Sequence, residues 1–299
     1  MVQAAGPGST VLIAGASTGI GRECALAFAR RGDRLVLSSR SRDALEQVAA
    51  DCGAAGATEV LVRPLDVTDR EAVETVVDEV VGLLGGLDVV VASAAVTAFG
   101  RFEDLPPEVF DAVVQTDVVG TSNVARAAVR HLRERGSGHL VLLGSMLGHA
   151  AMPYQAPYVM SKFAISALIR ILRQENQDRP GIAVHGIYPG PVDTPIYPDS
   201  ANYLGREVQV PPPADEPETV ARAVVGAVTS GRSRDRSVGW ANAAAVLAFR
   251  LVPRLYDALI APGLRAAAFT KRSVPTTPGN VLQAADRSRS RPEESRLRH

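Results

Sequence analysis

Short apolar runs alternate with longer amphipathic segments from residue 10 to residue 188. A run such as Val-Leu-Ile-Ala at 11–14 is apolar at every position, which is typical of a strand buried on both faces. The longer segments repeat apolar residues at helical spacing, and several are followed by glycine, which predicts helices. The pattern predicts strands at residues 11–14, 35–38, 59–64, 87–92, 139–143, 182–188 and 237–240, and helices at residues 22–31, 43–50, 69–84, 107–114, 121–135, 157–177 and 218–229.

The alternation predicts an α/β fold with a single doubly wound (Rossmann) domain, in which helices cover both faces of a mostly parallel sheet. Right-handed crossovers bring the carboxyl ends of the strands to one edge, and ligands of such folds bind beyond that edge. We assign residues 8–240 to this domain and residues 241–269 to a C-terminal helical extension. Residues 270–299 are rich in Arg, Ser and Pro, so we expect a disordered tail there.

Two segments after the sixth strand have a less regular pattern. Residues 189–217 contain several prolines and are predicted to form a lid or a binding loop. Residues 240–261 are apolar at helical spacing, interrupted by Arg250 and Arg254. We expect this helix to close a pocket or to pack on a partner subunit, and the alternative is an interfacial helix that lies on a membrane surface. No run of about 18 uncharged apolar residues predicts a membrane-spanning helix.

Composition narrows the classes of function. The 32 basic and 32 acidic residues cancel, whereas a nucleic-acid-binding protein usually carries a basic excess, so we expect no nucleic-acid partner. Two cysteines, Cys24 and Cys52, provide no disulfide framework, which fits a reducing compartment. Residues 1–10 lack the basic start and the apolar core of a signal peptide, so we expect a cytoplasmic protein. No residue pattern predicts a metal site.

A glycine-rich turn, Gly15-Ala16-Ser17-Thr18-Gly19-Ile20-Gly21, joins the first predicted strand to the first predicted helix. Glycine permits a tight turn, lets backbone N–H groups approach a phosphate, and lets the helix pack close to the strand. The positive end of the helix dipole favours a pyrophosphate at this place. The turn therefore predicts a dinucleotide site, and the alternative is that the glycines serve turn geometry alone.

The end of the second strand, Ser38-Ser39-Arg40, predicts which dinucleotide binds. An acidic residue here would hold the ribose 2′-hydroxyl of NAD, but this sequence has none. The Arg40 guanidinium can instead pair with the 2′-phosphate of NADP, and Ser17 and Thr18 can donate hydrogen bonds to it. We therefore expect NADP(H) as the cofactor rather than NAD(H), and the alternative is that Arg40 is a solvated surface charge.

Three polar residues are candidates for the chemistry. Tyr158 and Lys162 are four residues apart on a predicted helix, so both lie on one face. A free phenol has a pKa of about 10, and a nearby lysine cation favours the phenolate, so we expect Lys162 to lower the pKa of Tyr158. Ser145 follows the fifth strand at its carboxyl end, where its hydroxyl can hydrogen-bond a substrate oxygen as charge develops on it.

Together these motifs resemble the short-chain dehydrogenase/reductase family over residues 10–240. The glycine turn has the family's Gly-x-x-x-Gly-x-Gly spacing, Tyr158 and Lys162 match its Tyr-x-x-x-Lys pair, and Ser145 precedes Tyr158 at the family's usual distance. Residues 189–194, Pro-Gly-Pro-Val-Asp-Thr, resemble its nicotinamide-contacting loop, and Asp66-Val67 resembles its adenine-contacting pair.

The resemblance implies a role for each motif. Tyr158 is then the general acid in reduction and the general base in oxidation, Lys162 binds the nicotinamide ribose and lowers the pKa of Tyr158, and Ser145 positions the carbonyl. The family commonly forms dimers or tetramers through the helices at 121–135 and 157–177, which implies a homodimer or homotetramer. The cofactor-binding residues expected from the pattern and the resemblance are Gly15, Ser17, Thr18, Gly19, Ile20, Gly21, Ser39, Arg40, Asp66, Val67, Tyr158, Lys162, Pro189, Gly190, Val192 and Thr194, of which Val192 and Thr194 fix the nicotinamide carboxamide.

The sequence departs from the family pattern at three places. Ala14 replaces a frequent Thr, and Ala-Ser-Ala-Ala at 92–95 replaces Asn-Asn-Ala-Gly; because these two family sites contact each other, we interpret the changes as a compensated repacking. Asp117 stands where the family has a catalytic Asn, and Asn123, six residues on, points to another side of the helix. We predict that Asp117 holds the proton-relay water of that Asn, and that its negative charge raises the pKa of Tyr158.

The expected pocket is mostly apolar and has no basic cluster to hold a phosphate or carboxylate, which predicts a hydrophobic ketone or alcohol as substrate. We therefore predict an NADP(H)-dependent oxidoreductase that transfers a hydride between nicotinamide and such a substrate. The alternatives are a non-catalytic dinucleotide-binding regulator or scaffold, a lipid-associated structural protein, and an isomerase or dehydratase on the same fold. The residues expected around the pocket are Met146, Leu147, Met152, Tyr154, Ile196, Tyr197 and Tyr203, with His149 at the rim.

Overall fold

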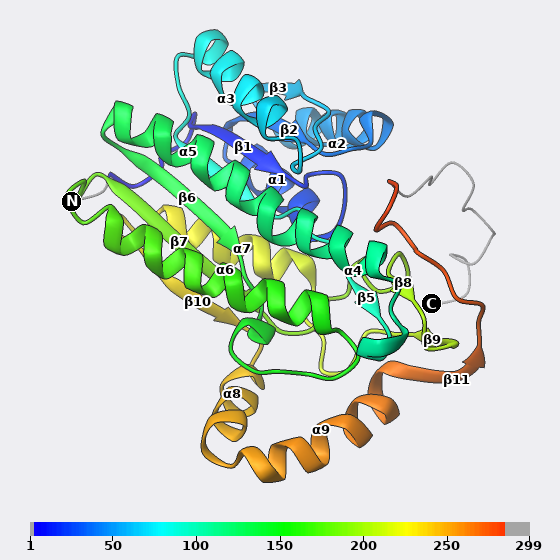
Figure 1. Cartoon of the computed structure of the whole chain (residues 1–299). Helices are drawn as coiled ribbons and strands as arrows, with labels where there is room; N and C mark the ends of the chain where they lie inside the picture. The colour runs from blue at the N-terminus through cyan, green and yellow to red at the C-terminus, as the bar shows by residue number, and fades with distance from the viewer. Residues whose placement is uncertain (1–2, 285–299) are drawn as a thin grey trace.

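A sheet of seven parallel strands forms the centre of the computed structural model, which describes residues 3–284 (Figure 1). The strand order is β10-β7-β6-β4-β1-β2-β3. Because β1 pairs with β2 on one side and with β4 on the other, the chain winds in both directions from β1. This confirms the predicted doubly wound fold. The strands are β1 Thr10–Ala14, β2 Arg34–Ser38, β3 Glu59–Val62, β4 Val89–Ala92, β6 Gly138–Leu143, β7 Ile182–Pro189 and β10 Asp235–Val238.

Helices cover both faces of the sheet and bury a separate apolar core on each. Val11 and Ile13 of β1 pack into the core under α1, α2 and α7, whereas Leu12 and Ala14 pack into the core under α3, α5 and α6. This division explains why the run at 11–14 in β1 is apolar at every position. The helices are α1 Gly19–Ala29, α2 Arg42–Ala55, α3 Arg70–Leu84, α4 Pro107–Val114, α5 Thr121–Arg135, α6 Ala156–Glu175 and α7 Pro217–Val228.

Local capping residues set several helix ends. The Ser41 side chain accepts a hydrogen bond from the Ala44 N–H at the start of α2, and Asp69 caps α3 in the same way. Gly85 and Gly136 end α3 and α5 in the left-handed conformation. The glycines place the predicted ends of α3 and α5 at the observed residues, whereas α2 continues five residues beyond its predicted end at 50, to Ala55.

Further short elements lie beyond the carboxyl edge of the sheet. The loop predicted at 189–217 contains two short strands, β8 and β9, and each pairs with a strand from elsewhere in the chain. Three short helical segments also occur here, and one of them is a π-helical turn. These elements are β5 Ala98–Phe99, β8 Ala201–Asn202, β9 Arg206–Val208, β11 Phe269–Ser273, η1 Phe102–Asp104, the π-helical turn η2 Gln115–Gly120, and η3 Met146–Gly148.

The C-terminal part differs from the prediction in three respects. Strand β10 ends at Val238, two residues before the predicted end, because Gly239 turns the chain with φ +116°. The apolar segment forms two helices, α8 Asn242–Leu251 and α9 Pro253–Ala268, separated at Val252. Residues from 270 onward, predicted to be disordered, instead begin as part of strand β11, which pairs with β9. Further along, Val281 is buried. The part of the predicted tail at 285–299 lies outside the described residues.

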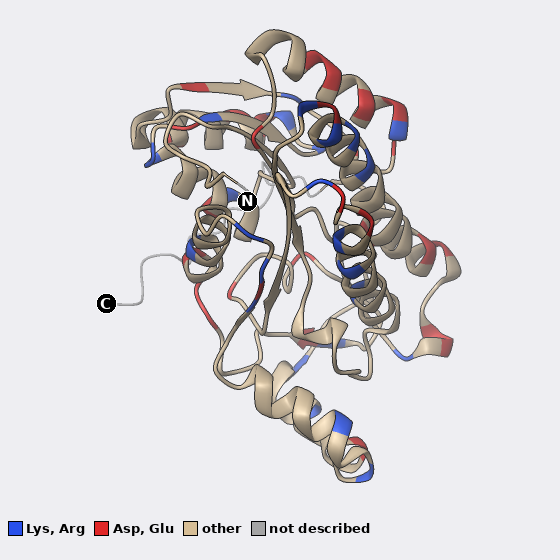
Figure 2. Ribbon diagram, turned by 90° about the vertical axis from the view of Figure 1, so that its left-hand side faces the viewer, with Lys and Arg blue, Asp and Glu red and all other residues tan. Residues whose placement is uncertain are grey.

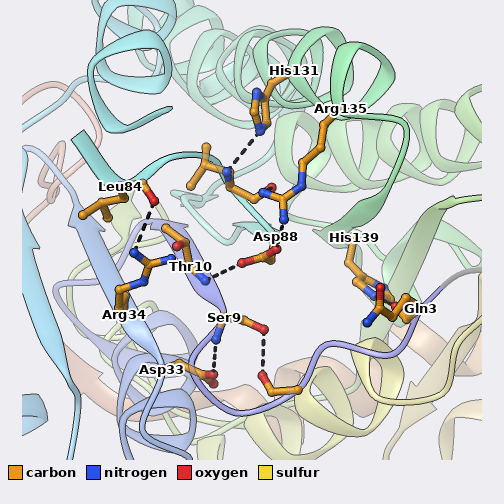
Figure 3. Close-up of polar contacts among 12 residues, drawn as sticks. Gln3, Ser9, Thr10, Asp33, Arg34, Leu84, Asp88, His131, Arg135 and His139 are labelled. Atoms are coloured by element: carbon orange, nitrogen blue, oxygen red, sulfur yellow. Dashed lines mark hydrogen bonds and ion pairs between the residues drawn. The ribbon is translucent and has the colours of Figure 1, made fainter. Parts of the chain in front are cut away.

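At the opposite edge of the sheet, polar side chains hold the amino ends of the strands (Figure 3). The Asp88 carboxylate accepts a hydrogen bond from the Thr10 N–H at 2.7 Å, and Asp33 accepts one from the Ser9 N–H at 3.0 Å. The His139 Nε2 lies 2.9 Å from the carbonyl oxygen of Gln3. These contacts fix the ends of neighbouring strands on the side of the sheet away from the glycine turn.

His139 belongs to a buried pair of histidines whose tautomers follow from their partners. A carbonyl only accepts, so His139 donates from Nε2 to Gln3 and accepts at Nδ1 from the Nε2–H of His185, 3.1 Å away. His185 Nδ1 then has no proton and no partner among the described residues. A proton added there would be a buried charged donor without an acceptor, so burial, with His139 and nearby arginines, lowers the pKa of His185 to about 3.

This pair predicts acid-sensitive stability. The unfolded chain binds a proton at each histidine near a pKa of about 6.5, whereas the folded chain resists it, so the free energy of unfolding falls as the pH drops from there toward the folded value. His185→Phe, which retains a ring to stack on His139, removes one such group. We expect the dependence of unfolding free energy on pH to become shallower by up to about 1.4 kcal/mol per pH unit in this window. Urea unfolding of both proteins over this pH range measures the difference, and identical slopes would contradict the assignment.

Candidate active site

The glycine turn between β1 and α1 has the shape of a phosphate-binding loop. Gly15 has φ +92°, and a Cβ on it would lie 2.5 Å from the backbone nitrogen of Ala94. A Cβ on Gly21 would collide with the carbonyl oxygen of Gly15. The Thr18 side chain does not cap α1, and the first turn of that helix has no acidic residue. The first N–H groups of α1 are therefore suited to an anionic ligand, and the turn fits a pyrophosphate.

The two departures beside this turn contact each other, as predicted. Ala14 and Ala92 are register partners in the β1–β4 pair. The Ser93 hydroxyl donates a hydrogen bond to the carbonyl oxygen of Ala14 at 2.9 Å, and the Ser93 N–H donates to the same oxygen. Small residues on both strands thus retain a polar link between β1 and β4 through Ser93.

Arg40 follows β2 and has a partner that the sequence did not predict. Its Nη2 donates a hydrogen bond to the carbonyl oxygen of Asn280, at 2.8 Å, which brings the C-terminal segment to the end of β2. The guanidinium has further N–H groups for an anion. The Asp66-Val67 turn is held by Asn123, whose Nδ2 donates to the carbonyl oxygen of Val67 at 3.0 Å. This role of Asn123 was also missed, because it joins residues that are far apart in sequence.

The structure brings Ser145, Tyr158 and Lys162 together at the carboxyl edge of the sheet. Ser145 lies two residues beyond the end of β6 and caps η3, and its Oγ accepts a hydrogen bond from the Leu147 N–H at 3.1 Å. One turn of α6 separates Tyr158 from Lys162, and the Lys162 Nζ lies 5.2 Å from the centroid of the Tyr158 ring. That Nζ also donates to the carbonyl oxygen of Leu143 at 3.1 Å, so the lysine is fixed by the end of β6.

Asp117 lies in the π-helical turn η2 and is almost completely buried, with 1% of its surface exposed. π-Helical turns inside helices are frequent at functional sites. The Oδ1 atom accepts a hydrogen bond from the Val96 N–H at 2.9 Å, whereas Oδ2 has no partner among the described residues. Burial raises the pKa of Asp117 to about 7, although Lys162 and the Val96 N–H both oppose the shift. The carboxyl therefore changes charge near neutral pH.

The pKa of Tyr158 is shifted in the opposite direction to the one expected from its lysine neighbour. Burial raises the pKa of Tyr158 well above its usual value, and the charges of Asp117 and Tyr197 add to the increase, while the Ser145 hydroxyl opposes it. The effect of Asp117 has the predicted direction. The expected lowering of the Tyr158 pKa by Lys162 is wrong for the net direction, because partial burial in the pocket disfavours the charged phenolate. Burial also lowers the pKa of Lys162, and Asp117 opposes that change.

The loop after β7 faces the glycine turn. Gly190 packs so closely on Asn242 that a Cβ would collide with the Asn242 side chain, and its N–H donates to the carbonyl oxygen of Val238. Thr194 lies beside Gly19: a Cβ built on that glycine would be 3.3 Å from the Thr194 Cβ. Two of the predicted cofactor-binding segments, far apart in sequence, are therefore neighbours in space.

A mostly apolar pocket opens beside Ser145 and Tyr158. Five of the predicted pocket residues line it, namely Met146, Leu147, Met152, Ile196 and Tyr197. Tyr154 and Tyr203 lie outside the lining; Tyr154 packs on Phe269 and Tyr203 on the small core that includes Val281. The remaining lining residues are Thr97, Phe99, Gln155, Gly190, Pro191, Pro211, Leu264 and Ala268.

Leu264 and Ala268 of α9 close one side of this pocket, as expected for the late apolar segment. Tyr256 fixes the helix in place, because its hydroxyl donates a hydrogen bond to the carbonyl oxygen of Ala151 at 2.8 Å. His149 lies beside the pocket and its ring packs on that of Tyr188, with centroids 4.6 Å apart. The apolar periodicity of the sequence predicted the helix, but it did not predict which of its residues meet the pocket.

Residues 9–202 match the family model of the short chain dehydrogenases. This match covers more than half of the chain, so the chain belongs to the short-chain dehydrogenase/reductase family.

Known relatives are similar over different lengths. The probable oxidoreductase EphD of Mycobacterium tuberculosis is 39% identical over 189 residues, which are 62% of this chain but only 31% of that protein. The chain thus spans about a third of that relative's length. The uncharacterized oxidoreductase YxnA of Bacillus subtilis is 30% identical over 84% of this chain and 70% of its own length.

A solved structure has the same architecture. It is an alcohol dehydrogenase from the archaeon Thermococcus sibiricus, complexed with 5-hydroxy-NADP. Its TM-score is 0.67 and its sequence identity 30%, over 77% of this chain and 95% of that one.

Proposed function

We propose that the protein is an NADP(H)-dependent oxidoreductase that transfers a hydride between nicotinamide and a hydrophobic ketone or secondary alcohol, with Tyr158 as the general acid or base. The observation that carries this proposal is the position of Ser145, Tyr158 and Lys162. All three meet at the carboxyl edge of the sheet, and Ser145 and Tyr158 line one apolar pocket. A protein that only bound a dinucleotide would need neither Ser145 nor Tyr158 in that pocket.

Residues along the same edge would hold the cofactor. The glycine turn 15–21 would bind the pyrophosphate, Asp66-Val67 the adenine, and Arg40 with Ser39 the 2′-phosphate. Lys162 would bind the nicotinamide ribose, and the loop with Pro189, Gly190, Val192 and Thr194 would contact the nicotinamide. The short spacing between Gly19 and Thr194 supports this arrangement, because one extended ligand can touch both segments. When bound, the reduced nicotinamide supplies the hydride.

The side chains of the pocket would handle the proton. In reduction, the Tyr158 hydroxyl donates its proton to the carbonyl oxygen as the carbonyl carbon gains the hydride, and in oxidation the phenolate takes the proton back. The Ser145 hydroxyl donates a hydrogen bond to the same oxygen and stabilises its developing negative charge. The raised pKa of Tyr158 favours the protonated phenol, which is the form required for reduction.

Asp117 would supply a second proton-holding group to this cluster. Its Oδ2 has no partner among the described residues, so it can accept a hydrogen bond from a water molecule that connects the site to solvent. Because its pKa is about 7, its charge changes close to neutral pH, and each change alters the field at Tyr158 and Lys162. We propose that the oxidation direction is therefore favoured at higher pH than the family's Asn would give.

The pocket supports an apolar substrate. Phe99, Met146, Met152, Ile196 and Leu264 line the pocket together with Ser145 and Tyr158, and none of the described residues that line it is charged. The polar side chains in the lining other than the proposed catalytic pair are Thr97, Gln155 and Tyr197, which suit one or two hydrogen bonds to a substrate.

Arg40→Ala tests the choice of cofactor. Loss of a charge-assisted pair with the 2′-phosphate is expected to raise the dissociation constant of NADPH by about tenfold to a hundredfold, and to leave that of NADH nearly unchanged. Fluorescence titration of the wild type and the variant with NADPH and with NADH measures these dissociation constants. Arg42→Ala is the matched control, because Arg42 is two residues away, is exposed and pairs with Glu46. Equal losses for NADPH and NADH would contradict the proposed contact.

Tyr158→Phe tests the chemistry. The variant retains the ring but lacks the proton, so turnover of a panel of apolar ketones, followed at the absorbance of reduced nicotinamide, is expected to fall about a hundredfold or more. NADPH binding should change only slightly, which shows that the variant is folded. Equal turnover in both proteins would exclude Tyr158 as the acid, and NADPH binding without turnover in the wild type would favour a regulator.

A further inference from the structure

The helices α8 and α9 form a hairpin with an exposed apolar surface. Most large apolar side chains of the protein are buried, but several in this hairpin face solvent, and four of them repeat at every fourth residue. The exposed side chains, with their exposed fractions, are Trp240 (83%), Leu247 (53%), Leu251 (71%), Val252 (47%), Leu255 (57%) and Leu259 (60%). We call this set the hairpin surface. Such a concentration of exposed apolar groups is typical of an interaction site.

The hairpin is firmly attached at its base and extends from the body of the protein (Figure 1). The Asn242 side chain donates hydrogen bonds to the carbonyl oxygens of Val238 and Tyr188, which fixes the start of α8. The rings of Phe249 and Tyr256 pack edge to face with centroids 5.3 Å apart, which holds α8 against α9. The hairpin surface is therefore a defined feature, and a flat partner can reach it without meeting the sheet domain.

Charges on the hairpin are mostly positive. Figure 2 shows the hairpin as largely uncharged ribbon with blue segments and some red near its tip, whereas acidic and basic residues are more frequent over the sheet domain. Residues 240–268 contain Arg250, Arg254 and Arg265 but a single acid, Asp257, and all four are exposed. Long arginine side chains can lie along an apolar surface and place their charge at its edge.

The hairpin surface also continues to the substrate pocket. Leu264 and Ala268 of α9 line that pocket, and a second hollow, under Trp240, shares Met146 and Pro191 with it. Apolar groups thus extend from the exposed tip of the hairpin to the region beside Tyr158. An apolar molecule taken up at the hairpin would remain in contact with apolar side chains as it entered.

We propose that the hairpin surface docks on an anionic lipid bilayer, with Trp240 and the exposed leucines in the interfacial layer and Arg250 and Arg254 on the lipid phosphates. No helix within residues 3–284 is long and apolar enough to cross a membrane, so the contact is with one leaflet. The charges favour lipid over a second copy of the chain. Two copies would bring together the arginines of both hairpins with only Asp257 from each to pair with them, whereas lipid phosphates can pair with every arginine.

The protein's single tryptophan makes the test direct, because Trp240 is itself part of the hairpin surface. The full chain is mixed with vesicles of phosphatidylcholine containing phosphatidylglycerol, and with vesicles of phosphatidylcholine alone. We expect flotation with the anionic vesicles and a blue shift of the tryptophan emission as the indole leaves water. The readout is lipid binding and not turnover, so it does not depend on the reaction proposed above.

Three variants locate the contact. L251E/L255E replaces two exposed leucines, and should lower partition into anionic vesicles at least about tenfold, because each leucine withdrawn from water accounts for about that factor. R250Q/R254Q should lower it about fivefold for each arginine and bring it toward the level of phosphatidylcholine alone. L83E is the matched control, because Leu83 of α3 is 60% exposed and lies outside the hairpin.

The proposal is supported if the wild type and L83E float and the two hairpin variants do not, with unchanged thermal unfolding in all four proteins. It is overturned if the wild type does not bind anionic vesicles, or if L251E/L255E binds them equally well. It is also overturned if the emission shifts with protein concentration in the absence of vesicles and L251E/L255E abolishes self-association, because the occupant would then be a second copy.

Discussion

The desolvation of three titratable side chains in one place is the constraint on which the site depends. Asp117 and Lys162 are buried and Tyr158 is partly buried in the wall of the pocket, so each charge must be stabilised by a neighbouring group or given up. Desolvation raises the pKa of Asp117 to about 7, raises that of Tyr158 and lowers that of Lys162. The protonation state of the Tyr158 phenol therefore depends on the whole cluster and not on Lys162 alone.

The parallel sheet makes this arrangement possible, because it brings distant parts of the chain to one edge. The end of β6 provides the carbonyl that holds Lys162, and Ser145 follows that strand. The π-helical turn provides Asp117, and the loop after β7 meets the glycine turn. α9 then closes the pocket with its inner face and exposes its outer face, so one hairpin contributes to both the proposed substrate pocket and the proposed lipid contact.

The fold and the local motifs could be predicted because their signals are local. Apolar residues at 11–14 in β1 indicated a strand buried on both faces, and the spacing of Tyr158 and Lys162 on one helix placed them together.

The contacts of Arg40 with Asn280 and of Asn123 with Val67 could not be predicted, because they join distant residues without a periodic pattern. The polar sequence of β11 forms a strand only through its partner β9. The pKa of Tyr158 was misjudged for a related reason: a lysine neighbour is visible in the sequence, but desolvation depends on the packing of the complete pocket.

The desolvation of this cluster is tested most directly by titrating Asp117 while its carboxyl band is followed by infrared difference spectroscopy. The spectrum of Asp117→Asn assigns that band. No substrate is needed, and the variant retains an oxygen for the Val96 N–H. The account predicts a protonated carboxyl that loses its proton with a midpoint near pH 7. A carboxylate that remains ionised down to the ordinary range of aspartate, a pKa of about 4, would show that the cluster is not desolvated as described and would contradict the account.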